Sequence, residues 1–335
     1  MKTLIVTGGA GFIGSNFVRR MVRAYPGYKI VVFDLLTYAG NLDNLADVID
    51  ARRVTFTQGD IRDREAVRAA LKGADMVVNF AAESFVDRSI LEPDSFITTD
   101  VLGAFVLLEA AKEFGVERFL QVSTDEVYGS VEQGSSRETD GILPNSPYSA
   151  SKAGGDLLAR SYAITYGVPV VVTRGSNTYG PYQHPEKLIP LFISNAIDDK
   201  PLPVYGEGNQ VRDWLHVDDH CSAIDLVLHK GEPGESYNVG GGCERTNMQV
   251  TSLILKYLDK PASLIKHVAD RPGHDKRYSL NCDKLHGLGW RTTKQFEDGL
   301  RETVEWYRDN ENWWRKAKES SEYQKFSSEW YSNRK

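Results

Sequence analysis

The chain has 335 residues, 41% hydrophobic and 26% charged, with a net charge of −6, which is ordinary for a globular protein of one large fold or two closely packed lobes. The negative charge and the lack of a basic tract argue against a nucleic-acid binder, and no apolar run approaches the roughly 18–20 residues that span a membrane. Three scattered cysteines, Cys221, Cys243 and Cys282, favour reduced thiols and a cytoplasmic location.

The first half of the chain alternates short apolar runs with amphipathic stretches. The runs are rich in Val, Ile and Phe without clean alternation, which is typical of strands covered on both faces. We expect strands at residues 4–7, 30–33, 54–58, 76–80, 119–123 and 170–173, and helices at 12–24, 63–71, 95–114 and 147–166. Alternation of strand and helix predicts an α/β fold with a doubly wound parallel sheet.

Beyond about residue 175 the pattern changes. Gly and Pro become frequent, the expected strands are short, and helices are expected at 218–228, 247–258 and 296–310. We therefore expect residues 1–175 to form mainly one domain, and residues 176–335 mainly a smaller mixed α/β lobe with some segments that return to the first sheet. The tail from Trp313 to Lys335 is expected to form a helix docked on the protein's own surface or on a second subunit.

A glycine-rich loop joins the first expected strand to the first expected helix. Its sequence, Thr-Gly-Gly-Ala-Gly-Phe-Ile-Gly at 7–14, has the glycines that a dinucleotide-binding (Rossmann) domain uses for a tight turn, for approach to pyrophosphate and for helix–strand packing. Asp34 ends the second strand, where a carboxylate binds ribose hydroxyls and repels a 2′-phosphate. Leu35 and Leu36 follow it instead of Arg, so NAD is favoured over NADP.

Tyr148 and Lys152 lie four residues apart on an expected helix and share one face. The pKa of a free tyrosine is near 10, too high for a base at neutral pH. A Lys charge about 4 Å away in a partly buried site is worth roughly 4 kcal/mol at an effective dielectric of about 20, enough to bring the pKa of the phenol near 7. With Ser123 and Thr124 at the end of the preceding strand, this is the proton-relay pattern of short-chain dehydrogenases.

Two carboxylates, Asp125 and Glu126, follow Thr124 directly. Most such pairs cap a helix or face solvent, but this pair follows a strand at the edge where doubly wound sheets bind ligands. A simple dehydrogenase needs one base, so an adjacent acid and base suggest a second event, such as elimination of water.

Four motifs together resemble the dTDP-glucose 4,6-dehydratase family, in the extended branch of the short-chain dehydrogenase/reductase superfamily. They are Ala-Ala-Glu-Ser-Phe-Val-Asp-Arg-Ser (81–89), Ser-Thr-Asp-Glu-Val-Tyr-Gly (123–129), Pro-Tyr-Ser-Ala-Ser-Lys-Ala (147–153) and Asn-Thr-Tyr-Gly-Pro-Tyr-Gln-His-Pro-Glu-Lys-Leu-Ile-Pro (177–190). The likeness runs to about residue 310, and the family usually has His where this chain has Phe85. The resemblance implies an NAD-dependent lyase of deoxysugar biosynthesis that converts dTDP-glucose to dTDP-4-keto-6-deoxyglucose.

The resemblance also implies how five catalytic residues divide the work. Tyr148 takes the C4 hydroxyl proton while hydride passes to NAD, Thr124 hydrogen-bonds the C4 oxygen, and Lys152 holds the cofactor ribose and tunes Tyr148. Glu126 removes the C5 proton, and Asp125 protonates the departing C6 hydroxyl. Adjacent carboxylates in a dry pocket tend to separate in pKa, which lets one act as acid and the other as base.

Ligand contacts are implied in the same way. The residues expected around NAD are Gly8, Gly11, Phe12, Ile13, Gly14, Asp34, Leu35, Thr37, Asp60, Ile61, Phe80, Ala81, Ala82, Ser84, Thr99, Tyr148, Lys152 and Thr178. Those expected around the nucleotide sugar are Ser84, Thr124, Asn177, Lys187, Leu188, Pro203, Val204, Tyr205, Arg212, Asn247, Asp270, Arg271, Pro272, Gly273 and His274. Arg212 is the expected diphosphate clamp, because a planar guanidinium suits bidentate phosphate contact.

No metal site is expected. His216 and His220 have the i, i+4 spacing of a metal pair, but the Glu expected after the first His is missing and no third ligand is apparent. The stretch instead opens a helix, where Asp218 and Asp219 suit the N-terminal dipole.

Three alternative functions stay open. A UDP-glucose 4,6-dehydratase shares nearly all the motifs, whereas a nucleotide-sugar 4-epimerase shares the glycine loop and the Tyr-Lys pair but generally lacks the Asp-Glu pair. A non-catalytic NAD-dependent sensor is opposed by the intact Thr124, Tyr148 and Lys152. By resemblance, we also expect a homodimer formed through the helices at 95–114 and 147–166.

Overall fold

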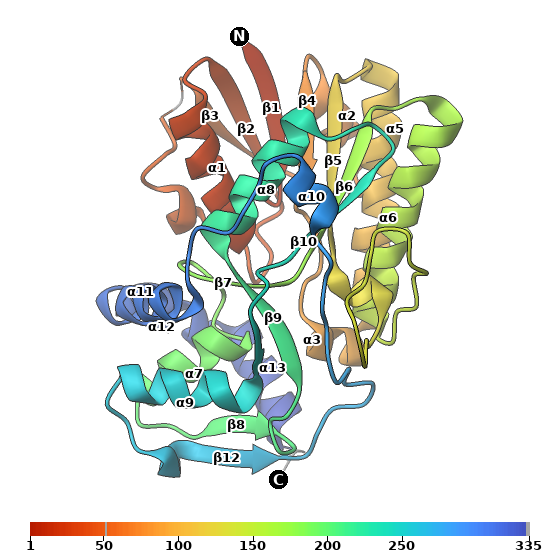
Figure 1. The fold of residues 1–335 in the computed structure, drawn as a ribbon. Coiled ribbons are helices and arrows are strands. Elements are labelled where there is room, and N and C mark those ends of the chain that lie inside the picture. Colours follow the sequence, from red (N-terminus) through yellow and green to blue (C-terminus); the bar gives the residue numbers. More distant parts are fainter. Residues whose placement is uncertain (51, 333–335) are drawn as a thin grey trace.

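A seven-stranded parallel sheet forms the larger part of the computed structural model, which describes residues 1–50 and 52–332 (Figure 1). The sheet order is β10-β6-β5-β4-β1-β2-β3. The strands are β1 (Lys2–Thr7), β2 (Tyr28–Asp34), β3 (Val54–Gln58), β4 (Met76–Asn79), β5 (Arg118–Thr124), β6 (Val170–Gly175) and β10 (Ser236–Val239). Six of them match the predicted strands to within two residues at either end, and the predicted α/β doubly wound fold is confirmed.

Helices cover both faces of this sheet (Figure 1). One face carries α1 (Phe12–Ala24) and α8 (Val217–Lys230), and the other carries α2 (Arg64–Leu71), α5 (Ala104–Phe114) and α6 (Pro147–Tyr166). Along β1, Leu4 and Val6 enter the first core and Ile5 the second, because successive strand side chains alternate in direction. Burial on both faces explains why the strands show no polar alternation in the sequence.

The helix predicted at 95–114 is divided into three segments. It starts as α4 (Pro93–Phe96), continues as the π-helical segment η2 (Ile97–Gly103) and ends as α5. A short helix, α3 (Val86–Leu91), precedes it, and η1 (Leu42–Leu45) lies between β2 and β3. Gly154 and Gly155 of α6 cross η2 closely: an added Cβ would lie 2.8 Å from Val101 Cγ2 and from the Asp100 carbonyl, respectively.

A smaller lobe lies below the large sheet in Figure 1. Its strands form two sheets, β11-β9-β7 and β12-β8. They are β7 (Asn177–Tyr179), β8 (Leu202–Tyr205), β9 (Val211–His216), β11 (Glu244–Thr246) and β12 (Ile265–Val268). A third core joins them to α7 (Leu188–Ile197), α9 (Asn247–Tyr257) and α11 (Phe296–Asp309). Three further short segments precede the tail. They are η3 (Asp125–Tyr128), which follows β5, η4 (Ala262–Leu264), which precedes β12, and α10 (Asp283–Gly287), whose Leu285 belongs to the first core.

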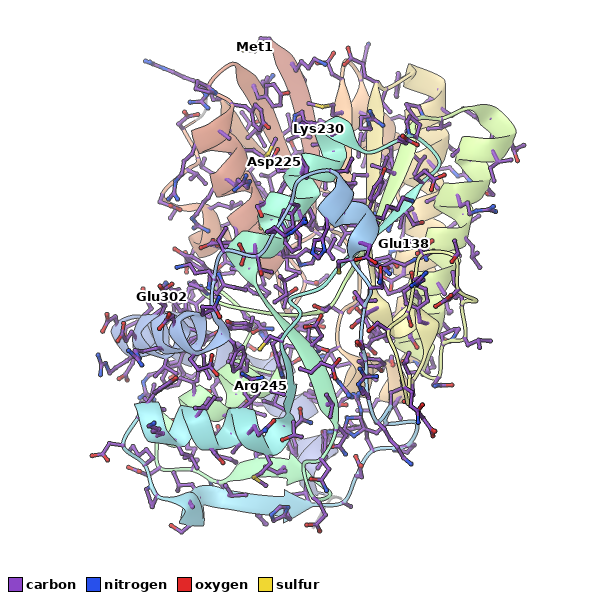
Figure 2. All side chains as sticks on the ribbon, viewed as in Figure 1. Met1, Glu138, Asp225, Lys230, Arg245 and Glu302 are labelled. Carbon is purple, nitrogen blue, oxygen red and sulfur yellow. The ribbon has the colours of Figure 1, made fainter. Side chains whose placement is uncertain are left out.

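Three segments from beyond residue 175, α8, β10 and α10, lie with the large sheet. Asp225 of α8 accepts hydrogen bonds from Arg20 Nε and from the Tyr25 hydroxyl, each at 2.8 Å (Figure 2). Glu138, in the loop before α6, accepts one from the Asn238 backbone N–H of β10 at 2.9 Å (Figure 2). The chain therefore crosses between the two parts several times.

The tail forms two helices, α12 (Glu311–Glu319) and α13 (Ser321–Ser332), docked on the chain's own surface. Trp314, Phe326 and Trp330 are buried there. Phe326 packs on Phe85, the position at which the family usually has His, with ring centroids 5.4 Å apart. None of the helices in residues 1–50 and 52–332 is long and apolar enough to cross a membrane.

Candidate active site

One cavity of about 450 Å³ lies at the carboxyl ends of the parallel strands. All five predicted catalytic residues line it, and so do all the residues predicted around the cofactor. The structure therefore brings these two predicted sets together at the sheet edge where doubly wound folds bind ligands.

The glycine-rich loop forms one wall of the cavity. A Cβ atom added to Gly8 would lie 2.5 Å from the Ala81 nitrogen, and one added to Gly14 would lie 2.4 Å from the Gly8 carbonyl oxygen. Gly8 also has a φ of +65°, which favours glycine. Gly11 precedes α1 without a side-chain cap, so the first N–H groups of this helix are available to a pyrophosphate.

Asp34 is held at the end of β2 by two backbone donors. Its Oδ2 accepts from the Ala10 N–H at 2.9 Å and its Oδ1 from the Leu36 N–H at 2.8 Å. Burial raises the pKa of this carboxyl, and the two hydrogen bonds oppose the rise. A carboxylate fixed beside the loop, with Leu35 lining the cavity instead of a cation, fits a ribose that carries free hydroxyls.

Tyr148 and Lys152 enter the cavity from the first turns of α6. Ser146 caps this helix and exchanges hydrogen bonds with Ser149, which fixes the start of the helix just before Tyr148. Lys152 is 7% exposed, and its ammonium donates to the Val122 carbonyl at 2.8 Å. Burial lowers its pKa.

The prediction that Lys152 brings the pKa of Tyr148 near 7 is wrong. Burial, followed by the charges of Glu126 and Asp100, raises the pKa of the phenol well above 10, and a hydrogen bond with Thr124 only partly opposes the rise. The expectation rested on attraction to nearby positive charge and left out burial, whereas desolvation of the phenolate dominates.

The carboxylate pair lies on η3, directly after β5. Thr124 Oγ1 accepts from the Glu126 N–H at 3.3 Å and donates to Asp125 Oδ1 at 3.1 Å. Asp125 is 3% exposed, and its Oδ2 has no hydrogen-bond partner among the described residues. The free oxygen is available to a ligand.

The two carboxyl groups differ in their surroundings. Burial, then the charges of Glu126 and Asp213, raises the pKa of Asp125 well above its usual range. Burial also raises the pKa of Glu126, but Arg271, Arg212 and Lys187 oppose that rise. The site can therefore hold Asp125 protonated and Glu126 ionised at one pH, as an acid and base pair requires.

Four residues predicted around the nucleotide sugar line the same cavity: Ser84, Thr124, Asn177 and Lys187. The Lys187 ammonium donates to the Ser84 carbonyl, and burial lowers the pKa of Lys187 to about 8. Asn177 Oδ1 is buried without a partner in the described part of the chain.

The other predicted nucleotide-sugar residues lie outside the cavity, in the smaller lobe. Arg212 is 5% exposed, and its guanidinium donates to the Val211 carbonyl at 2.8 Å and to the Asp275 carbonyl at 2.9 Å. Arg271 Nη1 pairs with Asp87 Oδ1 at 2.8 Å. Arg212 is buried and Arg271 is half-buried, and neither is a simple surface clamp.

Several residues of the cavity have no role predicted from the sequence. Glu83 and His184 line the cavity. Burial and Asp100 raise the pKa of Glu83 to about 7, and burial lowers that of His184 to about 3. Glu83 lies inside the motif at 81–89 and His184 inside the motif at 177–190, so membership of these motifs was the sequence signal that could have identified them.

Tyr278 is a further residue without an assigned role. Its hydroxyl donates to Asp275 Oδ2 at 2.6 Å and lies 3.4 Å from Glu126 Oε2. The Arg212 guanidinium stacks over its ring at 4.3 Å. Nothing in its local sequence marks Tyr278, because its contact with Glu126 joins residues 152 positions apart.

The histidines considered for a metal have other contacts. His216 precedes α8, and its ring accepts from the Asp218 N–H at 3.3 Å. His220 bonds Thr178 Oγ1 at 2.7 Å. Asp218 and Asp219 lie in the first turn of α8, as predicted.

The chain matches the family model described as GDP-mannose 4,6 dehydratase over residues 5–303. It is 51% identical over 324 residues to a dTDP-glucose 4,6-dehydratase of Streptomyces niveus, covering 95% of this chain and 96% of the relative. The solved dTDP-glucose 4,6-dehydratase of Streptomyces venezuelae, with NAD and dTDP bound, matches with a TM-score of 0.92 and 53% identity, covering 94% of this chain and 99% of the other. A UDP-glucose 4-epimerase of Thermus thermophilus in complex with NAD matches with a TM-score of 0.85 and 32% identity, covering 92% and 99%.

Proposed function

We propose that the chain, which belongs to the GDP-mannose 4,6-dehydratase family and is similar to proteins named dTDP-glucose 4,6-dehydratase, is an NAD-dependent hydro-lyase that converts dTDP-glucose to dTDP-4-keto-6-deoxyglucose. One observation carries the proposal. Asp125 and Glu126 share a cavity with Thr124, Tyr148 and the dinucleotide loop. The Tyr148 and Lys152 pair accounts for redox chemistry, which leaves the two carboxyl groups for elimination.

The residues of the cavity fit NAD through the Gly8–Gly14 turn, the start of α1 and the carboxylate of Asp34. When bound, NAD accepts a hydride from C4 of the sugar and returns it to C6, so there is no net redox change. Tyr148 takes the C4 hydroxyl proton, and Thr124, its hydrogen-bond partner, steadies the C4 oxygen. Because burial raises the pKa of Tyr148, this proton transfer depends on nearby positive charge, and Lys152 supplies one from the same helix face.

Elimination is assigned to the carboxyl pair. Glu126 takes the proton from C5, which the C4 ketone has acidified, and the electrons of that bond form a C5–C6 double bond. The C6–O bond breaks, and Asp125 protonates the leaving hydroxyl, so that water departs. Glu126 then returns its proton to C5 as hydride reaches C6. The contrast in pKa between the two groups supports this assignment.

We also propose that residues 1–175 serve mainly the cofactor and residues 176–335 mainly the nucleotide sugar, and that the enzyme is a cytoplasmic homodimer. Four apolar side chains on the helices predicted for the dimer are unusually exposed: Ile97 (50%), Leu102 (43%), Leu157 (52%) and Ile164 (64%). Exposed apolar patches mark association surfaces. Light scattering of the purified protein measures its molar mass in solution, and the mass of a monomer contradicts the proposed homodimer.

Turnover assays with dTDP-glucose and UDP-glucose side by side test the function. We expect the product of dTDP-glucose to have lost one water in mass spectrometry and to be a 4-keto-6-deoxy sugar by NMR. A product of unchanged mass with an inverted C4 indicates an epimerase instead. Equal or faster turnover of UDP-glucose contradicts the proposed preference for dTDP.

A further inference from the structure

Helix α13 packs against the nucleotide end of the proposed site. Phe326 and Trp330 form a buried cluster with Phe85, which directly follows the cavity residue Ser84. The Lys187 ammonium lies 4.9 Å from the centroid of the Phe85 ring. The tail therefore contacts the same short segment that carries cavity residues.

A chain of hydrogen bonds leads from α13 to Arg271, one of the residues expected around the nucleotide sugar. Trp330 Nε1 donates to the Tyr205 hydroxyl at 2.5 Å, and this hydroxyl donates to Asp87 Oδ2 at 2.6 Å. Asp87 Oδ1 accepts from Arg271 Nη1 at 2.8 Å. Tyr205 and Arg271 are both expected around the nucleotide, so the chain joins the tail to two ligand-binding residues.

The direction of these bonds follows from the groups involved. An indole N–H only donates and a carboxylate only accepts, so Tyr205 receives from Trp330 and gives its own proton to Asp87. Asp87 is 2% exposed and Trp330 is 3% exposed, so water does not readily replace either partner. Both oxygens of Asp87 are thereby engaged, which fixes the carboxylate and the guanidinium that it holds.

Arg271 retains capacity for a ligand while it is held in this way. Its Nε has no hydrogen-bond partner among the described residues, although the atom is buried. A half-buried guanidinium with one edge fixed by a carboxylate and a buried donor unused is prepared for an anion.

We propose that α13 is a positioning element for the nucleotide: Trp330 orients Tyr205, and through Asp87 it orients Arg271. The tail then sets affinity for the nucleoside diphosphate without touching the reacting carbons of the sugar. This inference rests on the proposed function for the identity of the ligand.

Trp330→Phe tests the proposal, because it keeps an aromatic ring and removes the donor. The matched control is Trp314→Phe in α12, whose indole donates to the Tyr307 carbonyl at 2.8 Å and whose residue is 1% exposed. In Trp330→Phe we expect dTDP to bind roughly 3- to 10-fold more weakly by isothermal titration calorimetry, KM to rise by a similar factor and kcat to change less than about twofold. Trp314→Phe should leave the Kd for dTDP and KM unchanged.

Tyr205→Phe breaks the same chain at its next member and serves if Trp330→Phe folds poorly. Both substitutions interrupt one chain of hydrogen bonds. The Kd of the double variant for dTDP should therefore exceed that of the weaker-binding single variant by no more than about twofold. An unchanged Kd in Trp330→Phe, or fully additive losses, overturns the proposal. So does a parent protein that binds neither dTDP nor UDP. A parent that binds dTDP without dehydrating dTDP-glucose refutes the proposed function alone, since the Kd comparison still decides the role of the tail.

Discussion

The proposed cofactor end of the site is made largely of backbone from neighbouring strand ends, whereas the proposed nucleotide end is made of charged side chains from distant segments. At the proposed cofactor end, Gly8 lies against the backbone of Phe80 and Ala81, Gly14 packs the start of α1 on Gly8, and the first N–H groups of the helix stay available. At the nucleotide end, Asp87 of α3, Arg271 after β12 and Trp330 of α13 meet through side-chain bonds. The first end depends on chain geometry, and the second depends on the completeness of a buried polar network.

The strongest test of this contrast is Gly14→Ala. The added Cβ would lie 2.4 Å from the Gly8 carbonyl, a backbone atom that the loop cannot move cheaply. We expect loss of bound NAD and at least roughly a 100-fold drop in turnover, because a misplacement of about 1 Å costs that much. Gly27→Ala is the control, since nothing lies within 4 Å of its added Cβ. Normal NAD content in Gly14→Ala contradicts the backbone account.

Asp87→Ala should disable the nucleotide end instead. It leaves the Arg271 guanidinium buried without its carboxylate, which costs about 3–5 kcal/mol of unfolding free energy. We expect denaturant unfolding to show this loss, and KM for the sugar nucleotide to rise at least about tenfold. Glu113→Ala, which removes an exposed ion pair with Arg68, should cost about 1 kcal/mol or less. Equal losses in the two variants would count against a special role for the buried network.

Much of the cofactor end could be predicted from the sequence, because its signals are local. The glycine spacing, Asp34 at a strand end and the Tyr148–Lys152 spacing each depend on one element and its end. The nucleotide end could be named only by resemblance, and Tyr278 and Trp330 had no local pattern to reveal them. The predicted pKa of Tyr148 was wrong because the burial that raises it is a property of the whole fold.

Asp125→Asn should separate stability from activity. The folded pKa of Asp125 is raised above its unfolded value, so the unfolded chain loses this proton first and stability falls as pH rises between the two values. The amide removes that loss, and we expect unfolding free energy at pH 8 to rise by ~1 kcal/mol or more while dehydration falls. Thermal unfolding of the parent and of Asp125→Asn at pH 5 and pH 8 measures this change in stability. A variant less stable than the parent at both pH values opposes this account of burial.

The smallest expected effect is a pH dependence from Lys187. Because its pKa is lowered to about 8, the ammonium proposed to contact the sugar nucleotide loses its charge as pH rises through that value. We expect KM to increase severalfold between about pH 7 and pH 9, and Lys187→Met to show a flatter profile. For stability the sign is opposite: the unfolded chain keeps the proton to higher pH, so this group favours folding more as pH rises above 8. A KM that is flat over this range rules out a charged role for Lys187.

The central claim is that redox and elimination belong to different residues of one cavity. The most direct measurement is a single-turnover experiment with Asp125→Asn/Glu126→Gln, which follows NADH absorbance and product mass together. We predict that bound NAD is still partly reduced by dTDP-glucose, while water loss falls by at least roughly 1000-fold. Normal dehydration by this double variant, or loss of NAD reduction and water loss to the same extent, would contradict the account.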